Sequence, residues 1–472
     1  MGSTLAVCTV GLLLAGWPVR TGHGTPPGPT ASPPPPSPGA PAGANAPAPA
    51  DANGAARDDD PFVAFAAVNP LFVRSSDGTR YEVARSRRRC FQAQVFPTRK
   101  GENEYRIFCL GGSTVWGRPY AAQTSFTTWL EFNLNLAEPA RRWRVVNCGG
   151  ISYASYRLVP LLKEVLGYRP DMIILYTGQN EFLEARQYPP AGGGPHEKSL
   201  MKADVEAMLD YKGGQAKYHR DEAWRRGVIE HYRYSVQRMV RMSRDARVKM
   251  LLMNPVCNLR DCPPFKSQHR DGLSPEQLQR WTALCREAEA QDWRPTRAVE
   301  LLRQAVAIDD QHADLHYRLA RLLDGMEDYA AARQEYVRAK ELDICPVRIV
   351  EPMNEAVLRI AREQRVPLVD VRKLIEKASV GGIPGDVHLS DHVHPRIAVH
   401  RSIADLLIDE MARQGVVCPR PGWKQQQDKQ AYEHLASLGY LYFEDGLLRL
   451  DAVRGWAAGL VTVPPPEPKP AP

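Results

Sequence analysis

Long apolar runs are scarce at the start of this 472-residue sequence. The run Leu5–Trp17 is shorter than the roughly 20 residues that a membrane-spanning helix needs. A basic segment before it is missing, and no cysteine stands where a lipoprotein would be cleaved. The run has the length of a signal-peptide apolar region, so we expect an extracytoplasmic protein, periplasmic or secreted, or one anchored to a membrane by its N-terminus.

Cysteine is also sparse, with nine residues in the chain. Most lie in apolar runs and are expected to be buried thiols. Cys257 and Cys262 differ, because they stand in a loop-like stretch and would be able to pair in an oxidising compartment. The sequence leaves that pairing open.

A nucleotide-binding motif and a hydrolase motif are both absent from the stretch FCLGGSTVWGRP. Gly112 and Gly117 have P-loop spacing, but Arg118 follows where the motif requires Lys. The G-x-S-x-G nucleophile elbow does not match either, because Val115 stands where that motif requires its second Gly. The net charge of +7 is spread along the chain without a nucleic-acid motif, so we expect no nucleic-acid partner.

Five short apolar runs dominate the organisation of the chain. Each has strand length, and helical patterns alternate with them, which predicts an α/β fold with a flavodoxin-like, three-layer parallel sheet. In such sheets the site lies at the carboxyl ends of the strands. The runs are Tyr105–Leu110, Trp143–Cys148, Asp171–Tyr176, Val248–Met253 and Val366–Val371.

A repeat fills the long gap between the fourth and fifth runs. Ala298, Leu302 and Asp309 match Ala332, Tyr336 and Asp343 at a constant offset (332 − 298 = 343 − 309 = 34). This is the period of tetratricopeptide repeats, although a plain helical hairpin would also fit. We expect an inserted α-helical subdomain that leans on the α/β body.

These patterns divide the chain into five parts. We expect a leader and a Pro- and Ala-rich linker (1–60), a first part of the α/β domain (61–270), the helical insertion (271–344), a second part of the α/β domain (345–420), and a helical tail with a Pro-rich end (421–472).

Ser113 follows the first apolar run directly and is the candidate nucleophile. Serine needs a base, and Asp391 and His394 are separated by two residues in a His-rich segment, where the carboxylate would orient the imidazole. Ser113 could instead be only a helix N-cap. A metal site among the histidines of 388–400 is the other alternative, which Pro395 disfavours.

Two further stretches follow strands and offer N–H donors for an oxyanion. Asn180 comes soon after the third run, and Gly149, Gly150 and Ser152 come after the second. All of them are expected at the edge of the sheet that carries Ser113.

These blocks together resemble the SGNH (GDSL-type) hydrolase family, over roughly 61–270 and 345–420. Gly111-Gly112-Ser113 stands for the family's GDS, Gly178-Gln-Asn-Glu181 for its G-x-N-D, and Asp391-His-Val-His394 for its D-x-x-H. The resemblance implies a Ser113–His394–Asp391 esterase that needs no cofactor or metal. Its oxyanion hole would use Asn180 and a donor among Gly149, Gly150 and Ser152.

The resemblance implies an ester substrate, either a small molecule or an O-acylated glycan or lipid-like ester. One alternative is an O-acyltransferase that acts on polysaccharide. Another is a non-catalytic scaffold that binds a protein partner through the repeat-like helices.

Overall fold

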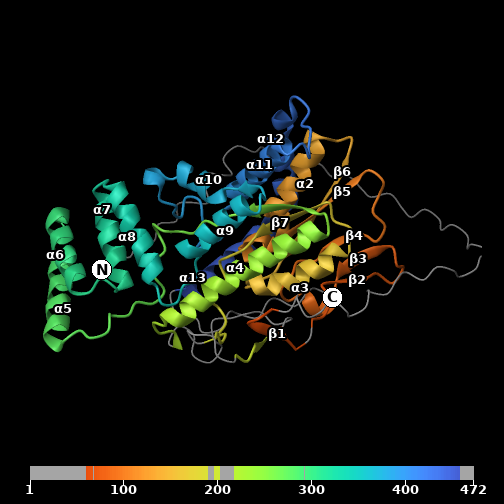
Figure 1. Cartoon of the computed structure of the whole chain (residues 1–472). Helices are drawn as coiled ribbons and strands as arrows, with labels where there is room; N and C mark the ends of the chain where they lie inside the picture. Colours follow the sequence, from red (N-terminus) through yellow and green to blue (C-terminus); the bar gives the residue numbers. More distant parts are fainter. Residues whose placement is uncertain (1–59, 67, 190–195, 202–216, 292, 458–472) are drawn as a thin grey trace, which may run out of the picture. The chain divides into compact units, whose positions relative to one another are not determined.

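The computed structural model describes residues 60–66, 68–189, 196–201, 217–291 and 293–457, so the expected leader, linker and Pro-rich end lie outside the described residues. Its centre is a five-stranded parallel sheet, in the order β10-β9-β7-β5-β6 (Figure 1). The strands are β5 (Glu104–Gly111), β6 (Arg142–Gly149), β7 (Met172–Tyr176), β9 (Lys249–Met253) and β10 (Leu368–Val369). In chain order this is 2-1-3-4-5, the flavodoxin-like arrangement, so the predicted fold class is confirmed.

Helices cover both faces of this sheet, because nearly every strand residue is apolar and neighbouring side chains point to opposite faces. Phe108, Leu110 and Ile173 pack in a core with α3, α4 and α9. Ile107, Cys109 and Ile174 pack in a second core with α2 and α11. These helices are α2 (Phe126–Ala137), α3 (Ser155–Leu166), α4 (Glu222–Asp245), α9 (Glu351–Glu363) and α11 (Ile397–Arg413). Helices α3 and α4 run side by side across one face (Figure 1).

Two small sheets were not predicted. Strands β2 (Phe72–Arg74), β3 (Arg80–Val83) and β4 (Val95–Pro97) form an antiparallel sheet, and β1 (Val63–Phe65) pairs with β8 (Ser199–Met201). These strands are too short for a periodic pattern to stand out in the sequence.

The insertion consists of α5 (Pro275–Ala290), α6 (Pro295–Ile308), α7 (Ala313–Gly325) and α8 (Tyr329–Leu342). Both bounds of α8 are those of α6 shifted by the same interval (329 − 295 = 342 − 308), which is the offset of the sequence repeat. The two aspartates that close the repeats are buried and fix the incoming chain. Asp309 pairs with His269, and Asp343 accepts from the backbone N–H groups of Phe265 and Lys266.

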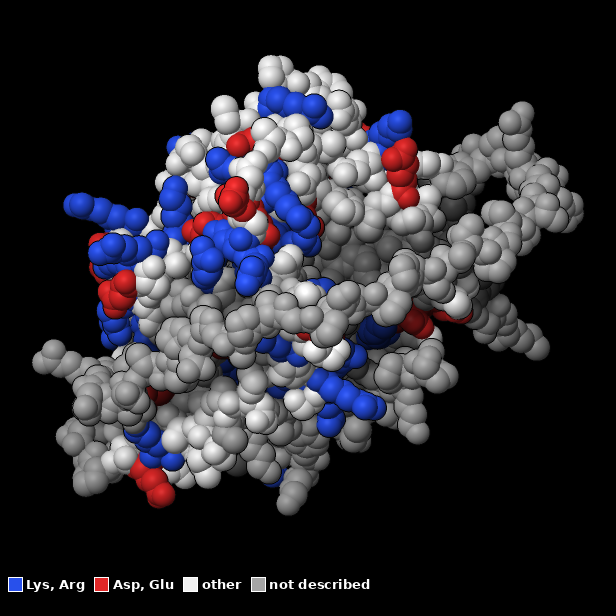
Figure 2. Space-filling view, turned by 90° about the vertical axis from the view of Figure 1, so that its right-hand side faces the viewer, with Lys and Arg blue, Asp and Glu red and all other residues white. Residues whose placement is uncertain are grey.

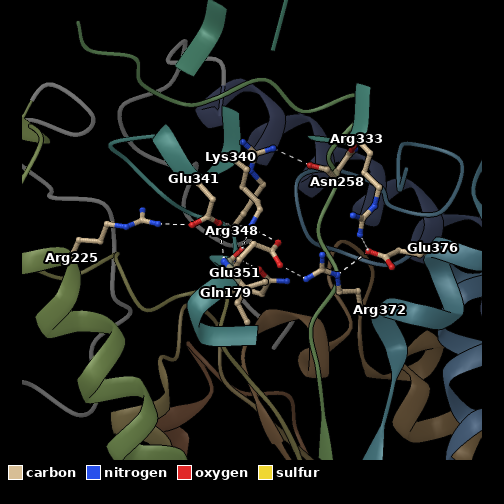
Figure 3. Close-up of polar contacts among 11 residues, drawn as sticks. Gln179, Arg225, Asn258, Arg333, Lys340, Glu341, Arg348, Glu351, Arg372 and Glu376 are labelled. Carbon is tan, nitrogen blue, oxygen red and sulfur yellow. Dashed lines mark hydrogen bonds and ion pairs between the residues drawn. The ribbon is translucent and has the colours of Figure 1, made fainter. Parts of the chain in front are cut away.

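A network of buried and half-buried ion pairs fastens the insertion to the body (Figure 3). At its centre Lys340 of α8 lies 2.7 Å from Glu341 and 3.0 Å from Glu351 of α9. The network reaches α4 and α10 (Val371–Ala378) through further pairs, which are Arg225–Glu341, Arg372–Glu351, Arg372–Glu376 and Arg333–Glu376.

The described chain ends in α12 (Trp423–Ser437) and α13 (Gly439–Ala457). None of the described helices combines the length and apolar character required to cross a bilayer. Cys257 and Cys262 are buried free thiols, so the pairing that the sequence left open does not occur. Burial raises the pKa of the Cys262 thiol to about 12.

Candidate active site

Ser113 begins α1 (Ser113–Trp116), one turn of helix directly after β5. Two glycines make this sharp exit possible. A Cβ on Gly111 would lie 2.1 Å from the Tyr176 carbonyl oxygen, and one on Gly112 would lie 2.4 Å from Asn180 Nδ2. The strand order places this turn between β5 and β7, at the point where the direction of the crossovers reverses.

Ser113, His394 and Asp391 form a continuous hydrogen-bonded chain. His394 Nε2 lies 2.7 Å from Ser113 Oγ, and His394 Nδ1 lies 2.7 Å from Asp391 Oδ2. The second carboxylate oxygen, Oδ1, accepts from the backbone N–H groups of Val393 and His394 at 2.9 Å each. Asp391 is therefore fixed, and it selects the tautomer that leaves Nε2 as the acceptor for the serine proton.

The electrostatics of the site keep Asp391 ionised. Burial by itself would raise the pKa of this carboxyl, but the electrostatic interaction with the His394 and His392 imidazoles and the hydrogen bonds from His394 and Val393 outweigh burial. The pKa of Asp391 therefore lies well below its ordinary value. A carboxylate that stays charged can stabilise an imidazolium at His394.

The candidate oxyanion donors do not all have a free N–H. Gly149 donates its N–H to Asn147 Oδ1, and Gly150 donates its N–H to the Gly111 carbonyl, both at 2.9 Å. These two expected donors are therefore already used within the fold. Ser152 has a left-handed φ of 60°. Within the described part of the chain, its N–H makes no hydrogen bond.

Asn180 lies beside the nucleophile turn, as expected. Its Nδ2 donates one hydrogen bond to the Tyr153 carbonyl at 3.1 Å, which leaves the second N–H of the amide for a ligand. The Ser113 N–H also lacks an acceptor in the part of the chain that the structure describes. Among the candidate donors, the N–H groups of Ser113, Ser152 and Asn180 are therefore the ones that the described part of the fold does not use fully.

Buried polar side chains join the loops that carry these donors. Glu181 accepts from the N–H and the hydroxyl of Ser155, which ties the loop after β7 to the loop after β6. Asn147 donates to the Val115 carbonyl at 2.6 Å and so ties the β6 loop to the nucleophile turn. The Glu and Asn side chains therefore set the relative positions of the donors.

Asn258, which sequence reasoning missed, holds the segment that carries Asp391 and His394. Its Nδ2 donates to Asp386 Oδ1 at 2.7 Å and to the Asp391 carbonyl at 3.2 Å, and its N–H donates to the His392 carbonyl. Arg348, which is buried, donates in turn to the Asn258 carbonyl (Figure 3). The position of Asn258 just beyond β9, at the same sheet edge as Ser113, was the available signal.

The C-terminal helix α13 bridges both halves of the site. Arg449 donates to the Tyr120 carbonyl, just beyond the nucleophile turn, and Arg454 donates to the Ser390 carbonyl, next to Asp391. Tyr442 of the same helix bonds Thr124 at 2.8 Å and packs near Trp116. The tail, to which the sequence assigned no role, therefore contacts the loops that present the triad.

The other histidines of the segment point to separate partners. His388 Nε2 lies 3.1 Å from the Ala378 carbonyl, while His400 Nδ1 accepts from the Phe126 N–H. Burial lowers the pKa of His392 to about 4 and that of His400 to about 3. In the described residues, no group of three or more metal-ligating side chains comes together.

Comparisons with known proteins find two kinds of similarity. Residues 290–343 match the family described as tetratricopeptide repeat. The insertion is a tetratricopeptide-like segment. No curated protein matches the chain.

The solved structures that resemble the chain include several esterases and hydrolases. Axe2, an acetylxylan esterase from Geobacillus stearothermophilus, is 13% identical, and the match covers 65% of this chain and 94% of that one, with a TM-score of 0.33. A protein described as lipolytic and of the G-D-S-L family, from Desulfitobacterium hafniense DCB-2, is 10% identical over 65% and 98% of the two chains, with a TM-score of 0.31. LAE5, an alpha/beta hydrolase from the metagenome of Lake Arreo, is 14% identical over 67% and 97%, with a TM-score of 0.33.

Proposed function

We propose that this protein is a serine-dependent hydrolase of carboxylic esters. The observation that carries the proposal is the unbroken chain from Ser113 Oγ through the His394 imidazole to a buried, ionised Asp391. A serine hydroxyl is a weak nucleophile until an adjacent base accepts its proton, and this geometry supplies that base.

In the proposed reaction, Ser113 Oγ attacks the ester carbonyl while its proton passes to His394 Nε2. The N–H groups of Ser113, Ser152 and Asn180 receive the negative oxygen of the tetrahedral intermediate. His394 then gives the proton to the departing alcohol, and water, activated by the same imidazole, releases the acid. We propose O-acylated extracytoplasmic glycans or lipid-like esters as the substrate class.

The test is hydrolysis of aryl esters from acetyl to octanoyl by the wild-type protein, Ser113→Ala and His394→Ala. We expect turnover in the wild type and a loss of about 10⁴-fold or more in each variant. Equal rates in all three proteins would disprove the triad. If all three are inactive although folded, release of product with a polysaccharide acceptor would favour acyl transfer over hydrolysis.

We also propose that the activity lies outside the cytoplasm, on the strength of the apolar run Leu5–Trp17. Fusion of residues 1–60 to a reporter that is active only after export tests this location. An inactive fusion that accumulates in the cytoplasm would contradict it.

A further inference from the structure

Three arginines adopt a backbone conformation that normally favours glycine. Arg169, Arg247 and Arg365 have φ values of 57°, 57° and 53°. For a residue with a Cβ, the left-handed conformation costs roughly 1–2 kcal/mol relative to the right-handed one. Glycine would occupy the same turns without that cost.

All three arginines occupy equivalent places in the fold. Arg169 follows α3 and precedes β7, Arg247 follows α4 and precedes β9, and Arg365 follows α9 and precedes β10. These three strands are neighbours in the sheet, so the three turns lie in a row with steps of about 5 Å. They form the amino-terminal edge of the sheet, opposite the edge that carries Ser113.

The arginine side chains have no visible task inside the molecule. All three are exposed, and within the described residues none of the three makes a side-chain hydrogen bond or an ion pair. Arg142 and Lys249, which begin β6 and β9, are exposed at the same edge. Asp245 and Glu363 are exposed carboxylates on the neighbouring helix ends, so a surplus of positive charge remains.

Figure 2 views the side that lies away from helices α5–α8 in Figure 1, and Lys and Arg gather on it. A hollow of about 270 Å³ opens beside the turns that precede β9 and β10. Its polar lining residues are Ser243, Arg244, Lys249, Gln364, Arg365 and Gln414, and the rest of its lining is apolar, namely Met172, Val240, Val248, Met250, Leu251, Val366 and Pro367. Ser243 is only 1% exposed, and its hydroxyl has no partner among the described residues. A buried hydroxyl without a partner beside three cations suits an anionic oxygen ligand.

We propose that this edge, named here the arginine edge (Arg142, Arg169, Arg247, Lys249 and Arg365), docks on an anionic phospholipid surface. A guanidinium group can bind two oxygens of one phosphate, which suits the headgroups of anionic phospholipids. In this proposal, the hollow that Ser243 lines receives one such headgroup phosphate. The hollow has no aromatic lining residue on which nucleic-acid bases would stack. Docking by this edge leaves the Ser113 edge open to solvent, and a charged patch would supplement the apolar run Leu5–Trp17 as a second membrane signal.

The test compares binding of the full chain to vesicles of phosphatidylcholine alone and to vesicles of an equimolar mixture of phosphatidylcholine and phosphatidylglycerol. The apolar run contributes to both, so the difference between the two measures the arginine edge. We expect the wild type to prefer the anionic vesicles, and added salt to remove that preference. The triple variant Arg169→Gly, Arg247→Gly and Arg365→Gly should bind the anionic vesicles about 10²-fold more weakly than the wild type. Each arginine near an anionic lipid surface contributes separately to the binding free energy.

Glycine suits the backbone of these turns, so the triple variant should melt at the same temperature as the wild type or higher. The matched control removes three exposed arginines from helices α5 and α6, as Arg280→Gln, Arg286→Gln and Arg303→Gln. It should keep the anionic preference. Equal binding of the wild type to both kinds of vesicle would overturn the proposal. So would a preference for anionic vesicles that the glycine variant retains or that the control loses. A melting temperature of the glycine variant below that of the wild type would also overturn it. Binding of the wild type to DNA of equal charge, without a preference for anionic vesicles, would overturn it as well.

Discussion

At the scale of single residues, Gly112 shows how much of the site depends on an absent side chain. An added Cβ would lie 2.4 Å from Asn180 Nδ2, and because that amide ends a side chain, it would move rather than the backbone. Gly112→Ala should therefore displace an oxyanion donor while Ser113 and His394 stay in contact. We expect kcat to fall about 10²-fold, measured by steady-state ester hydrolysis.

The control for this variant is Gly325→Ala, at a position where an added methyl group meets no atom within 4 Å. Its activity should match that of the wild type. An unchanged kcat in Gly112→Ala would remove Asn180 from the proposed oxyanion hole.

His400 predicts a pH dependence of stability. Burial lowers its pKa from 6.5 to about 3, so the unfolded chain binds the proton more readily than the folded protein. The folded state therefore loses stability as the pH falls below about 6.5, by roughly 1.4 kcal/mol per pH unit from this residue.

His400→Gln should remove this contribution. The free energy of unfolding of the variant minus that of the wild type should increase as the pH is lowered from 7 to 5. Urea denaturation at each pH measures this difference. The comparison at each pH cancels the contributions of the other titrating groups. A constant difference between the two proteins would show that His400 is not held neutral in the fold.

At the scale of elements, the loop that carries Asp391 and His394 depends on Asn258. Asn258→Ala removes the hydrogen bonds to Asp386 and to the Asp391 carbonyl, which allows the loop to shift. Small displacements of a catalytic group cost about 10²-fold in turnover, so kcat should fall by that order with little change in KM. Asn135→Ala, which removes an exposed amide from α2, is the control. A matching loss in both variants would contradict a specific role for Asn258.

Helix α8 depends on its buried lysine. Lys340 is 1% exposed and contacts Glu341, Glu351 and the Ile349 carbonyl. Lys340→Ala removes the buried cation between Glu341 and Glu351, which keep only Arg225 and Arg372 as cationic partners among the described residues. The loss should cost about 3 kcal/mol in unfolding free energy. Chemical denaturation measures the change, with the exposed Arg297→Ala expected to behave as the wild type. If Lys340→Ala lowers the unfolding free energy as little as Arg297→Ala does, water must reach the ion pairs around Lys340.

At the scale of the whole molecule, the insertion and the body share one core. Leu301, Leu302 and Leu319 of the helices pack with Leu259 and Val393 of the body, and Val393 adjoins His394. We expect Leu302→Ala to lower the melting temperature of one common calorimetric transition, since a buried Leu→Ala change costs about 2–5 kcal/mol. Leu278→Ala, at a half-exposed position of α5, should have little effect. A separate early transition in Leu302→Ala would show that the insertion unfolds alone.

The sequence alone determined the features that depend on local pattern. The five apolar runs became the five parallel strands, since burial on both faces requires nearly continuous apolar residues. The constant offset between the two repeats predicted equivalent helices, and α6 and α8 have bounds related by that offset. The spacing of Asp391 and His394 is also local, because one short turn of chain brings the carboxylate to the imidazole.

Only the tertiary structure decided which distant groups meet. The pairing of β5 with β6 decides that the Gly149 N–H donates to Asn147 and that the Gly150 N–H donates to Gly111. The roles of Asn258 and of α13 depend on contacts between residues that lie far apart in the chain. Such contacts leave no periodicity in a sequence, because hydrogen bonds between loops are set by the packing of the strands that carry them.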